Sequence, residues 1–318
     1  MYCIKKDRQT MAYNIEEKLV IGVASSALFR LDEADTIFRS NGIAAYREYQ
    51  RAHQQDVLQT GIAYPFIKRF LHLNELFPEE HPVEVVLLSH NDPDTGARVM
   101  HSIRHYKLPI QLAAFTTGAS PYAYIPAYNV ALFLSANEDD VRQAAAQGYA
   151  AGQVLDSAAT DDENDDELRI AFDFDGVLAD DSAEIVYKAG GLKLFQMTES
   201  ANAANPLPQG PLAALLSKLA SIRKMEDALQ EKDPAYKRFL KTAIVTARSA
   251  PADQRIVSTL RSWDITVDQT FLLGGIEKGR ALSILKPHIF FDDQRYPHLE
   301  SSSPYTPSVH IPFGTINK

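Results

Sequence analysis

The sequence predicts an α/β fold, a three-layer α/β/α arrangement with a mostly parallel sheet, built as two related halves. Short apolar runs alternate along the chain with stretches of helical periodicity, which is typical of a parallel sheet covered by helices on both faces. An acidic run without any apolar residue, Thr160 to Glu167, separates two parts of similar length. These parts also repeat each other in spacing. We therefore expect one half over 18–159, a solvated acidic linker over 160–168 and a second half over 169–318.

In the second half, four strands and three helices are expected. Each strand is a short run of mostly apolar residues, and each helix carries apolar residues at helical spacing. The strands cover 169–173, 242–246, 270–273 and 288–291, and the helices cover 212–225, 252–262 and 278–285. Because strands and helices alternate, we expect the strands to lie parallel in one sheet.

The first half follows the same plan with matching distances along the chain. Segment 21–26 aligns without gaps with 170–175, and glycines lie 16 and then 19 positions further on in both parts. Later, 87–108 corresponds to 243–265, and 131–137 corresponds to 288–294. We interpret this as an ancient duplication. The alternative is that any two βα repeats share apolar strands and amphipathic helices for physical reasons alone.

Two pairs of acidic residues follow expected strands in the second half. Asp173 and Asp175 lie at the end of one expected strand, and Gly176 permits a tight turn that lets the Asp173 carboxylate and the Asp175 carbonyl approach one cation. Asp292 and Asp293 end another strand. Ligand sites in open α/β sheets lie at the carboxyl ends of strands, and grouped carboxylates suit Mg²⁺. Since clustered negative charges repel unless a cation or protons offset them, we predict a metal site.

The corresponding positions of the first half carry no carboxylate. They are Ala24, Ser26, Ser135 and Ala136. If the duplication is real, only the second half holds the metal and performs chemistry.

A threonine and a lysine complete the pattern. Thr246 ends an expected strand, where its hydroxyl can donate to a phosphoryl oxygen. Lys278 opens an expected helix and can neutralise charge on a nucleophile and a phosphate. Either residue alone is more often structural, but their order and context favour a functional role.

These motifs resemble those of the haloacid-dehalogenase-like (HAD-like) phosphohydrolases. They are DxDGV at 173–177, a strand-end Thr, a downstream Lys and a strand-end DD, and together they cover 169–295. DxD alone is a weak signal, whereas the four motifs in this order are specific as a set. The resemblance implies a Rossmannoid HAD-like fold with a catalytic half at 169–318 and a degenerate half at 18–159.

A narrower resemblance, to the cytosolic type I 5′-nucleotidases, covers nearly the whole chain. It rests on IGVASSALF, LSHNDPDTGARVMHSIRHY, TTGASPYAYIPAY, VTARSAP, LRSW and HIFFDDQ. One departure is FDFDGV, where animal members read closer to FDGDAV; both acids of the pair remain, and only the local turn geometry is in doubt. This resemblance implies Mg²⁺-dependent hydrolysis of nucleoside monophosphates such as AMP or IMP.

The resemblance also implies what each catalytic residue does. Asp173 attacks the 5′-phosphorus and forms an aspartyl-phosphate, which water then hydrolyses. Asp175 protonates the departing 5′-oxygen and later activates the water. Thr246 and Lys278 stabilise the phosphoryl group in transit.

The implied metal site draws on the same acids. Asp173, Asp292 and the carbonyl of Asp175 hold Mg²⁺. Asp293 is either a further ligand or a partner of a ligand.

Substrate contacts are expected in both halves. Arg248 either contacts the phosphate or forms a salt bridge. In the first half, polar residues near strand ends are candidates for binding a phosphate or a ribose, with an ordinary polar turn as the alternative. They are Ser89, Asn91, Thr117, Gly118 and Ser120. We expect the metal-free first half either to complete the substrate pocket or to hold a regulatory nucleotide.

Two other functions fit the same motifs. One is a HAD-like phosphatase for other small phosphomonoesters such as sugar phosphates, because the motifs fix phosphoryl chemistry but not the leaving group. The other is a nucleotide-sensing protein without catalysis. The intact acids of the second half favour an enzyme over the sensor.

Composition argues against several classes of protein. The net charge of −9 and the lack of a basic patch disfavour nucleic-acid binding. No apolar run approaches the ~20 residues that cross a bilayer, and the first residues lack the apolar core of a signal peptide. The single cysteine, Cys3, allows no intrachain disulfide and fits the cytoplasm. Residues 1–17 are expected to be flexible, with Met11 as an alternative start, and a homo-oligomer is left open.

Overall fold

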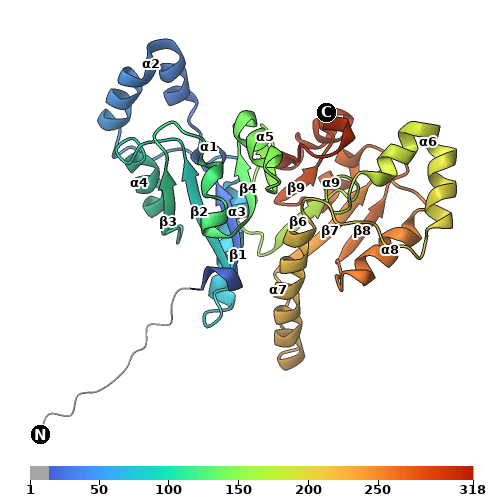
Figure 1. The fold of residues 1–318 in the computed structure, drawn as a ribbon. Helices are drawn as coiled ribbons and strands as arrows, with labels where there is room; N and C mark the ends of the chain where they lie inside the picture. Colours follow the sequence, from blue (N-terminus) through green and yellow to red (C-terminus); the bar gives the residue numbers. More distant parts are fainter. Residues whose placement is uncertain (1–13, 318) are drawn as a thin grey trace, which may run out of the picture.

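The computed structural model describes residues 14–317, and within them one ten-stranded sheet runs through both halves (Figure 1). The strand order is β3-β2-β1-β4-β5-β10-β9-β6-β7-β8. Neighbours are parallel except β5 and β10, which pair antiparallel and join two parallel half-sheets. The strands are β1 Leu19–Val23, β2 Val83–Ser89, β3 Leu112–Phe115, β4 Val130–Ser135, β5 Ala151–Val154, β6 Leu168–Phe172, β7 Leu240–Thr246, β8 Gln269–Leu272, β9 Ile289–Asp292 and β10 Ser308–His310.

Helices connect the strands in both halves. They are α1 Ser25–Leu28, α2 Asp32–Ala52, α3 Tyr64–Leu76, α4 Ala97–His105, α5 Glu138–Ala146, α6 Ser182–Ala201, α7 Ala213–Lys232, α8 Asp253–Ser262, α9 Lys278–Leu285 and α10 Glu300–Ser302. Short 3₁₀ turns cover Ile15–Glu17, Pro121–Tyr124, Pro126–Tyr128 and Thr315–Asn317, and a π-helical turn covers Arg295–Leu299. Within residues 14–317, no helix combines the length and the apolar character needed to cross a membrane.

The core lies on both faces of the sheet, because successive side chains of a strand point to opposite faces. In β1, Leu19 and Ile21 belong to one large apolar cluster, to which α3, α4, α7 and α8 contribute from both halves. Val20 belongs to a separate cluster with α5. On the same side of the second half, α9 covers β6 and β7. The predicted three-layer α/β fold is therefore confirmed.

The two half-sheets have the same strand order and the same register. Ile21 of β1 pairs with Val85 of β2 and Leu132 of β4. Ile170 of β6 pairs with Thr242 of β7 and Ile289 of β9. The sequence alignment makes Ile21 equivalent to Ile170 and Leu132 equivalent to Ile289, and Val85 lies four positions before Ser89 as Thr242 lies four before Thr246. The halves therefore share a topology as well as a sequence pattern.

The two halves also have left-handed backbone conformations at equivalent positions. Five pairs of equivalent positions have positive φ in both halves, although only two of the pairs conserve the residue. They are Gly42 and Gly191, Lys107 and Asp264, Thr117 and Gly274, Gly118 and Gly275, and Asn129 and Lys286. Two of the pairs, Lys107 with Asp264 and Asn129 with Lys286, follow helical turns, where a left-handed residue is common. The other three pairs do not follow from helix termination. This repetition favours duplication over coincidence.

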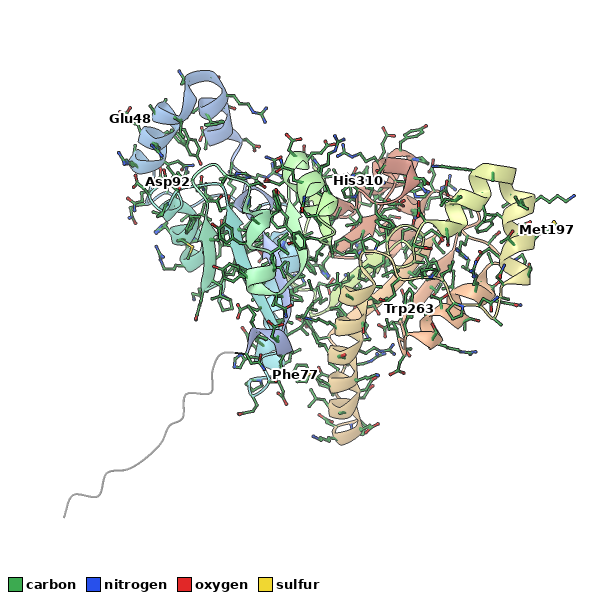
Figure 2. All side chains as sticks on the ribbon, viewed as in Figure 1. Glu48, Phe77, Asp92, Met197, Trp263 and His310 are labelled. Atoms are coloured by element: carbon green, nitrogen blue, oxygen red, sulfur yellow. The ribbon has the colours of Figure 1, made fainter. Side chains whose placement is uncertain are left out.

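Each half carries a broken helix after its first strand. In α2 the helix is interrupted at Gly42, and in α6 at Gly190 and Gly191, where the backbone leaves helical angles. Figure 1 shows α2 and α6 at the two upper corners of the molecule, each beyond its own half-sheet. Met197 projects from α6 and is 61% exposed (Figure 2). We call α2 and α6 the cap helices.

Most expected elements are present, with ends shifted by one or two residues. The helix expected over 212–225 is longer, because α7 continues to Lys232. The acidic linker has no helix or strand but is not simply solvated. Buried Arg69 donates to Asp161 at 3.0 Å and to the carbonyl of Asp162 at 2.8 Å, so part of the run is tied to α3.

The end of the segment expected to be flexible, 1–17, lies within the described residues. Ile15–Glu17 form a 3₁₀ turn, because Asn14 caps it by accepting from the N–H of Glu16 at 3.3 Å. The amide of Asn129 also donates to the carbonyl of Ile15 at 3.4 Å. Residues 1–13, with Cys3 and Met11, lie outside the described residues.

Candidate active site

Lys278 is buried between two aspartates that follow neighbouring strands. Its Nζ lies 2.8 Å from Asp173 Oδ2 and 2.6 Å from Asp292 Oδ2. Asp173 follows β6 and Asp292 ends β9, and these strands pair in parallel, so their carboxyl ends meet at one edge of the sheet. Lys278 opens α9 and is 1% exposed. The structure thus brings together three residues that the motifs singled out.

Burial and pairing set the protonation of this group. Burial raises the pKa of Asp173 to about 6, against the opposing effect of Lys278. For Asp292 the same burial is outweighed by Lys278 and His298, and its pKa falls below the usual value. The two aspartates likewise outweigh burial for Lys278 and raise its pKa. Asp173 is therefore an anion above about pH 6 with an ammonium group in contact.

Asp293 is the least compensated acid of the group. It is 3% exposed, and its Oδ1 has no hydrogen-bond partner among residues 14–317. Burial, together with the charges of Asp173 and Asp292, raises its pKa to about 9. Gly176 borders it closely: a Cβ there would lie 2.4 Å from Asp293 Oδ2, and its φ of +71° also favours glycine. An acid whose charged form is disfavoured by its neighbours in this way is expected where a cation binds, because a bound cation would favour the charged form.

The acids fit a divalent cation. Asp173, Asp292 and His298 each offer one ligand atom, and these atoms lie within 4.8 Å of one another. His298 lies in the π-helical turn after β9, with Nδ1 3.1 Å from Asp292 Oδ1. With Asp293 beside them the donors are mainly carboxylate oxygens, which suit a hard cation such as Mg²⁺.

Arg248 connects Asp175 to the cap helix α6. Its Nε and Nη2 each donate to one carboxylate oxygen of Asp175, both at 2.7 Å. Its Nη1 contacts Glu199 of α6, which also accepts from Arg255 Nη1 at 2.6 Å. Arg248 is 4% exposed and Glu199 is 1% exposed. Although burial opposes it, the acids Asp175 and Glu199 raise the pKa of Arg248, so the guanidinium stays charged.

This contact is one of the two alternatives predicted for Arg248. The structure shows the salt bridge, and its carboxylate partners occupy the guanidinium on both sides. The contact also separates Asp175 from the other acids, because its side chain is held by Arg248 rather than by Lys278.

Thr246 lies at the same edge of the sheet. It ends β7, which pairs in parallel with β6, and it is 1% exposed. Its Oγ1 accepts from the N–H of Arg248 at 3.2 Å. The hydroxyl hydrogen then points elsewhere and can be donated to a phosphoryl oxygen.

The expected substrate contacts of the first half lie apart from these acids. Ser89, Asn91, Thr117 and Gly118 line a cavity of about 760 Å³ in the first half. Five strands lie between β2, which ends at Ser89, and β6. Ser120 is not one of the lining residues and donates to Asp140 Oδ1 at 2.6 Å. The structure therefore gathers four of the five, but not around Asp173.

Sequence reasoning missed Glu199, Arg255 and His298. Glu199 lies inside a helix with no motif around it. Only the equivalent position of the first half could have indicated that a buried polar residue is needed there. The aligned position of the first half is Gln50, also buried at 2%. His298 follows the strand-end acids by a few residues, and only the π-helical turn brings it back to Asp292.

Comparison with known proteins gives one family. A family model described as 5′-nucleotidase matches residues 11–318. Cytosolic 5′-nucleotidase 1B of Homo sapiens is 33% identical over 290 residues, which are 89% of this chain and 47% of that protein. The chain thus spans about half the length of the curated relative it matches. No solved structure gives a significant match.

Proposed function

Because this chain belongs to the 5′-nucleotidase family, we propose that it hydrolyses nucleoside 5′-monophosphates to nucleosides and phosphate. The observation that carries the proposal is the buried contact of Lys278 with Asp173 and Asp292, beside an Asp175 that Arg248 holds by two hydrogen bonds. A nucleophile, a cation and a separately oriented acid are the parts that phosphoryl transfer through an aspartate requires. The arrangement is that expected of a HAD-like phosphatase.

In the first step, a carboxylate oxygen of Asp173 attacks phosphorus and the bond between phosphorus and the 5′-oxygen breaks. Lys278, in contact with that carboxylate, offsets the charge that gathers on the phosphoryl oxygens. Thr246 donates its hydroxyl hydrogen to one of those oxygens. The product on the chain is an aspartyl-phosphate at Asp173.

Asp175 handles the protons of both steps. It gives a proton to the leaving 5′-oxygen and then takes one from the water that hydrolyses the aspartyl-phosphate. The bidentate contact with Arg248 fixes the orientation of the Asp175 carboxylate, so we assign Arg248 a positioning role rather than a substrate contact. Through Glu199 the same arginine is anchored to the cap helix α6.

We propose Mg²⁺ as the cation, held by Asp173 and Asp292 with His298 and Asp293 beside them. When bound, it neutralises phosphoryl oxygens and relieves the repulsion among these acids. The carbonyl of Asp175 is proposed as a further ligand.

The proposal extends to the substrate, the role of the first half and the cellular compartment. The substrate is a small nucleotide such as AMP or IMP, and the first half is proposed as the degenerate half that carries no metal. The name of the human relative describes a cytosolic protein, and we propose the cytoplasm for this chain.

Phosphate release from a panel of substrates tests the proposal. The panel holds AMP, IMP, GMP, CMP, UMP, their deoxy forms, ribose 5-phosphate and a nitrophenyl phosphate, each with Mg²⁺ and with EDTA. The proposal expects metal-dependent release from one or more nucleotides. Release only from ribose 5-phosphate or the nitrophenyl ester would keep the chemistry of Asp173 but remove the nucleotide assignment. No release from any of them would remove the enzyme assignment.

A further inference from the structure

We propose that the cavity of the first half is a second, metal-independent binding site, and that its ligand is an uncharged nucleoside. The cavity has a volume of about 760 Å³, within the range of small-molecule sites. It occupies the place in the first half that the catalytic group occupies in the second. Ala24, Ser89 and Asn91, which line it, are equivalent to Asp173, Thr246 and Arg248.

The floor of the cavity is polar but uncharged. Ser25 and Ser89 are buried, with their hydroxyl oxygens 3.1 Å apart. Asn91 is 8% exposed, and its Oδ1 accepts from the hydroxyl of Tyr46 at 2.6 Å. Its Nδ2 has no hydrogen-bond partner among the described residues and is buried. A buried donor without a partner costs free energy, so it indicates an acceptor that arrives with a ligand.

The charges around the cavity disfavour a phosphate. Two arginines line it, Arg39 and Arg47, against four acids, Asp92, Glu138, Asp139 and Asp140. Arg47 is already paired with Asp92, whose carboxylate lies 2.9 Å from its Nε, at the foot of the cap helix α2 (Figure 2). The lining therefore carries more negative than positive charge, even if His90 is protonated. None of the described residues that line the cavity is a lysine, and a phosphate dianion would meet the excess negative charge of this lining with Arg39 as its main cation. Hydroxyl groups of a neutral ligand could instead donate to the acids.

The cap side of the cavity is apolar and suits a flat ring. Phe38 and Ile43 of α2 line it and are 51% and 54% exposed, so both side chains are accessible to a ligand in the cavity. The ring of Phe38 meets that of Tyr46 edge to face, with centroids 5.8 Å apart. An aromatic wall above a floor of hydroxyl and amide groups fits a base joined to a ribose. The choice of a nucleoside among neutral ligands rests on the proposed function, since that reaction makes one.

Isothermal titration calorimetry with adenosine and uridine, in EDTA, tests this site without any turnover. We expect wild-type protein to bind at least one of the two nucleosides in EDTA, and AMP more weakly. Phe38→Ala should weaken binding about tenfold, the usual loss when one stacked ring is removed. Asn91→Leu removes the free donor and should weaken it by a similar factor, with urea unfolding showing that each variant is folded.

The duplication supplies a matched control. Tyr187, 47% exposed on α6, is the position equivalent to Phe38, so Tyr187→Ala should leave the EDTA-resistant binding unchanged. Three results would each overturn the site: no binding of either nucleoside, binding lost in Tyr187→Ala but kept in Phe38→Ala, or AMP binding tighter than the nucleosides in EDTA. Because none of these depends on phosphate release, failure here is distinct from failure of the proposed catalysis.

Discussion

Arg248 holds Asp175 by two hydrogen bonds of 2.7 Å, one to each carboxylate oxygen. Asp175 follows β6 and Arg248 follows β7, and these strands pair in parallel, so both residues lie at the carboxyl edge of the sheet. A planar guanidinium matched to a carboxylate fixes orientation as well as charge. The position of the proposed acid is therefore set by a residue that need not touch the substrate.

Replacing Arg248 by lysine keeps a positive charge but loses the fork that orients Asp175. We expect kcat for a nucleoside monophosphate to fall about 100-fold, the usual cost of a misplaced catalytic group. A nitrophenyl phosphate, whose leaving group needs little protonation, should lose much less. The comparison of the two substrates is the measurement, and equal losses would contradict the positioning role.

Glu199 is expected to be a large contributor to stability, because it is buried between Arg248 and Arg255. Glu199→Gln should lower the free energy of unfolding by about 3 kcal/mol, since Arg255 and Arg248 both lose a buried charged partner and Arg248 keeps only Asp175. The control is the double variant Glu199→Gln with Arg248→Asn, which copies Gln50 and Asn91 of the first half and should recover part of the loss. Urea unfolding measures both, and an unchanged single variant would contradict the account.

Gly176 is expected to be needed for Asp293 rather than only for the turn. Gly176→Ala would place a Cβ 2.4 Å from Asp293 Oδ2 at a φ of +71°. Gly148→Ala is the matched control, because Gly148 has a φ of +83° and nothing within 4 Å of the added atom. Both changes should cost about 1–2 kcal/mol of backbone strain. Only Gly176→Ala should also abolish the rise in melting temperature on adding Mg²⁺, and the same rise in both variants would contradict this.

His288 should make the protein less stable in acid. It is buried, its Nδ1 accepts from the N–H of Arg169 at 3.0 Å, and burial with the charges of Arg69 and Arg169 lowers its pKa from 6.5 to about 4. The folded state therefore holds it neutral while the unfolded state binds a proton below pH 6.5. Stability is full above that value and falls as pH drops toward 4, by about 2 kcal/mol between pH 7 and pH 5.

His288→Asn tests this sign, because asparagine can still accept from Arg169 but does not titrate. Urea unfolding at pH 7 and pH 5 should show a smaller loss in the variant than in the wild type. His105→Asn, at an exposed position, is the control and should keep the wild-type loss. An identical loss in wild type and His288→Asn would contradict the assignment.

The sequence predicted the parts of the fold that local pattern determines. The strands that carry Asp173, Thr246 and Asp292 are apolar runs with polar ends, so both their existence and the edge at which they meet could be inferred. The antiparallel pair that joins the halves could not. β5 and β10 are four and three residues long and read AGQV and SVH, so neither is an apolar run like those that predicted the similarly short β8 and β9.

The residues of the site that belong to a fixed sequence motif could be predicted. The residues that reach the site only through tertiary contacts could not. Lys278 and the four acids stand in an ordered motif. The bond of Arg248 to Glu199 spans 49 positions, and the tie of Arg69 to the linker spans 92. The tertiary packing determines which residues form such long-range ion pairs, so the local sequence pattern does not predict them. The duplicated half was an internal guide, since the equivalent residues Gln50 and Asn91 are polar and both hydrogen-bond to the hydroxyl of Tyr46.

The central claim is that Asp173 is the nucleophile of a nucleotide phosphatase. The most direct test is to measure phosphate release by the Asp173→Asn variant from the nucleoside monophosphate that the wild type hydrolyses fastest. The variant keeps size and packing, so it should fold as the wild type does by circular dichroism. We predict that its kcat with Mg²⁺ falls by at least about a thousandfold, because an amide cannot form the aspartyl-phosphate. Turnover near that of the wild type in a folded variant would contradict the account.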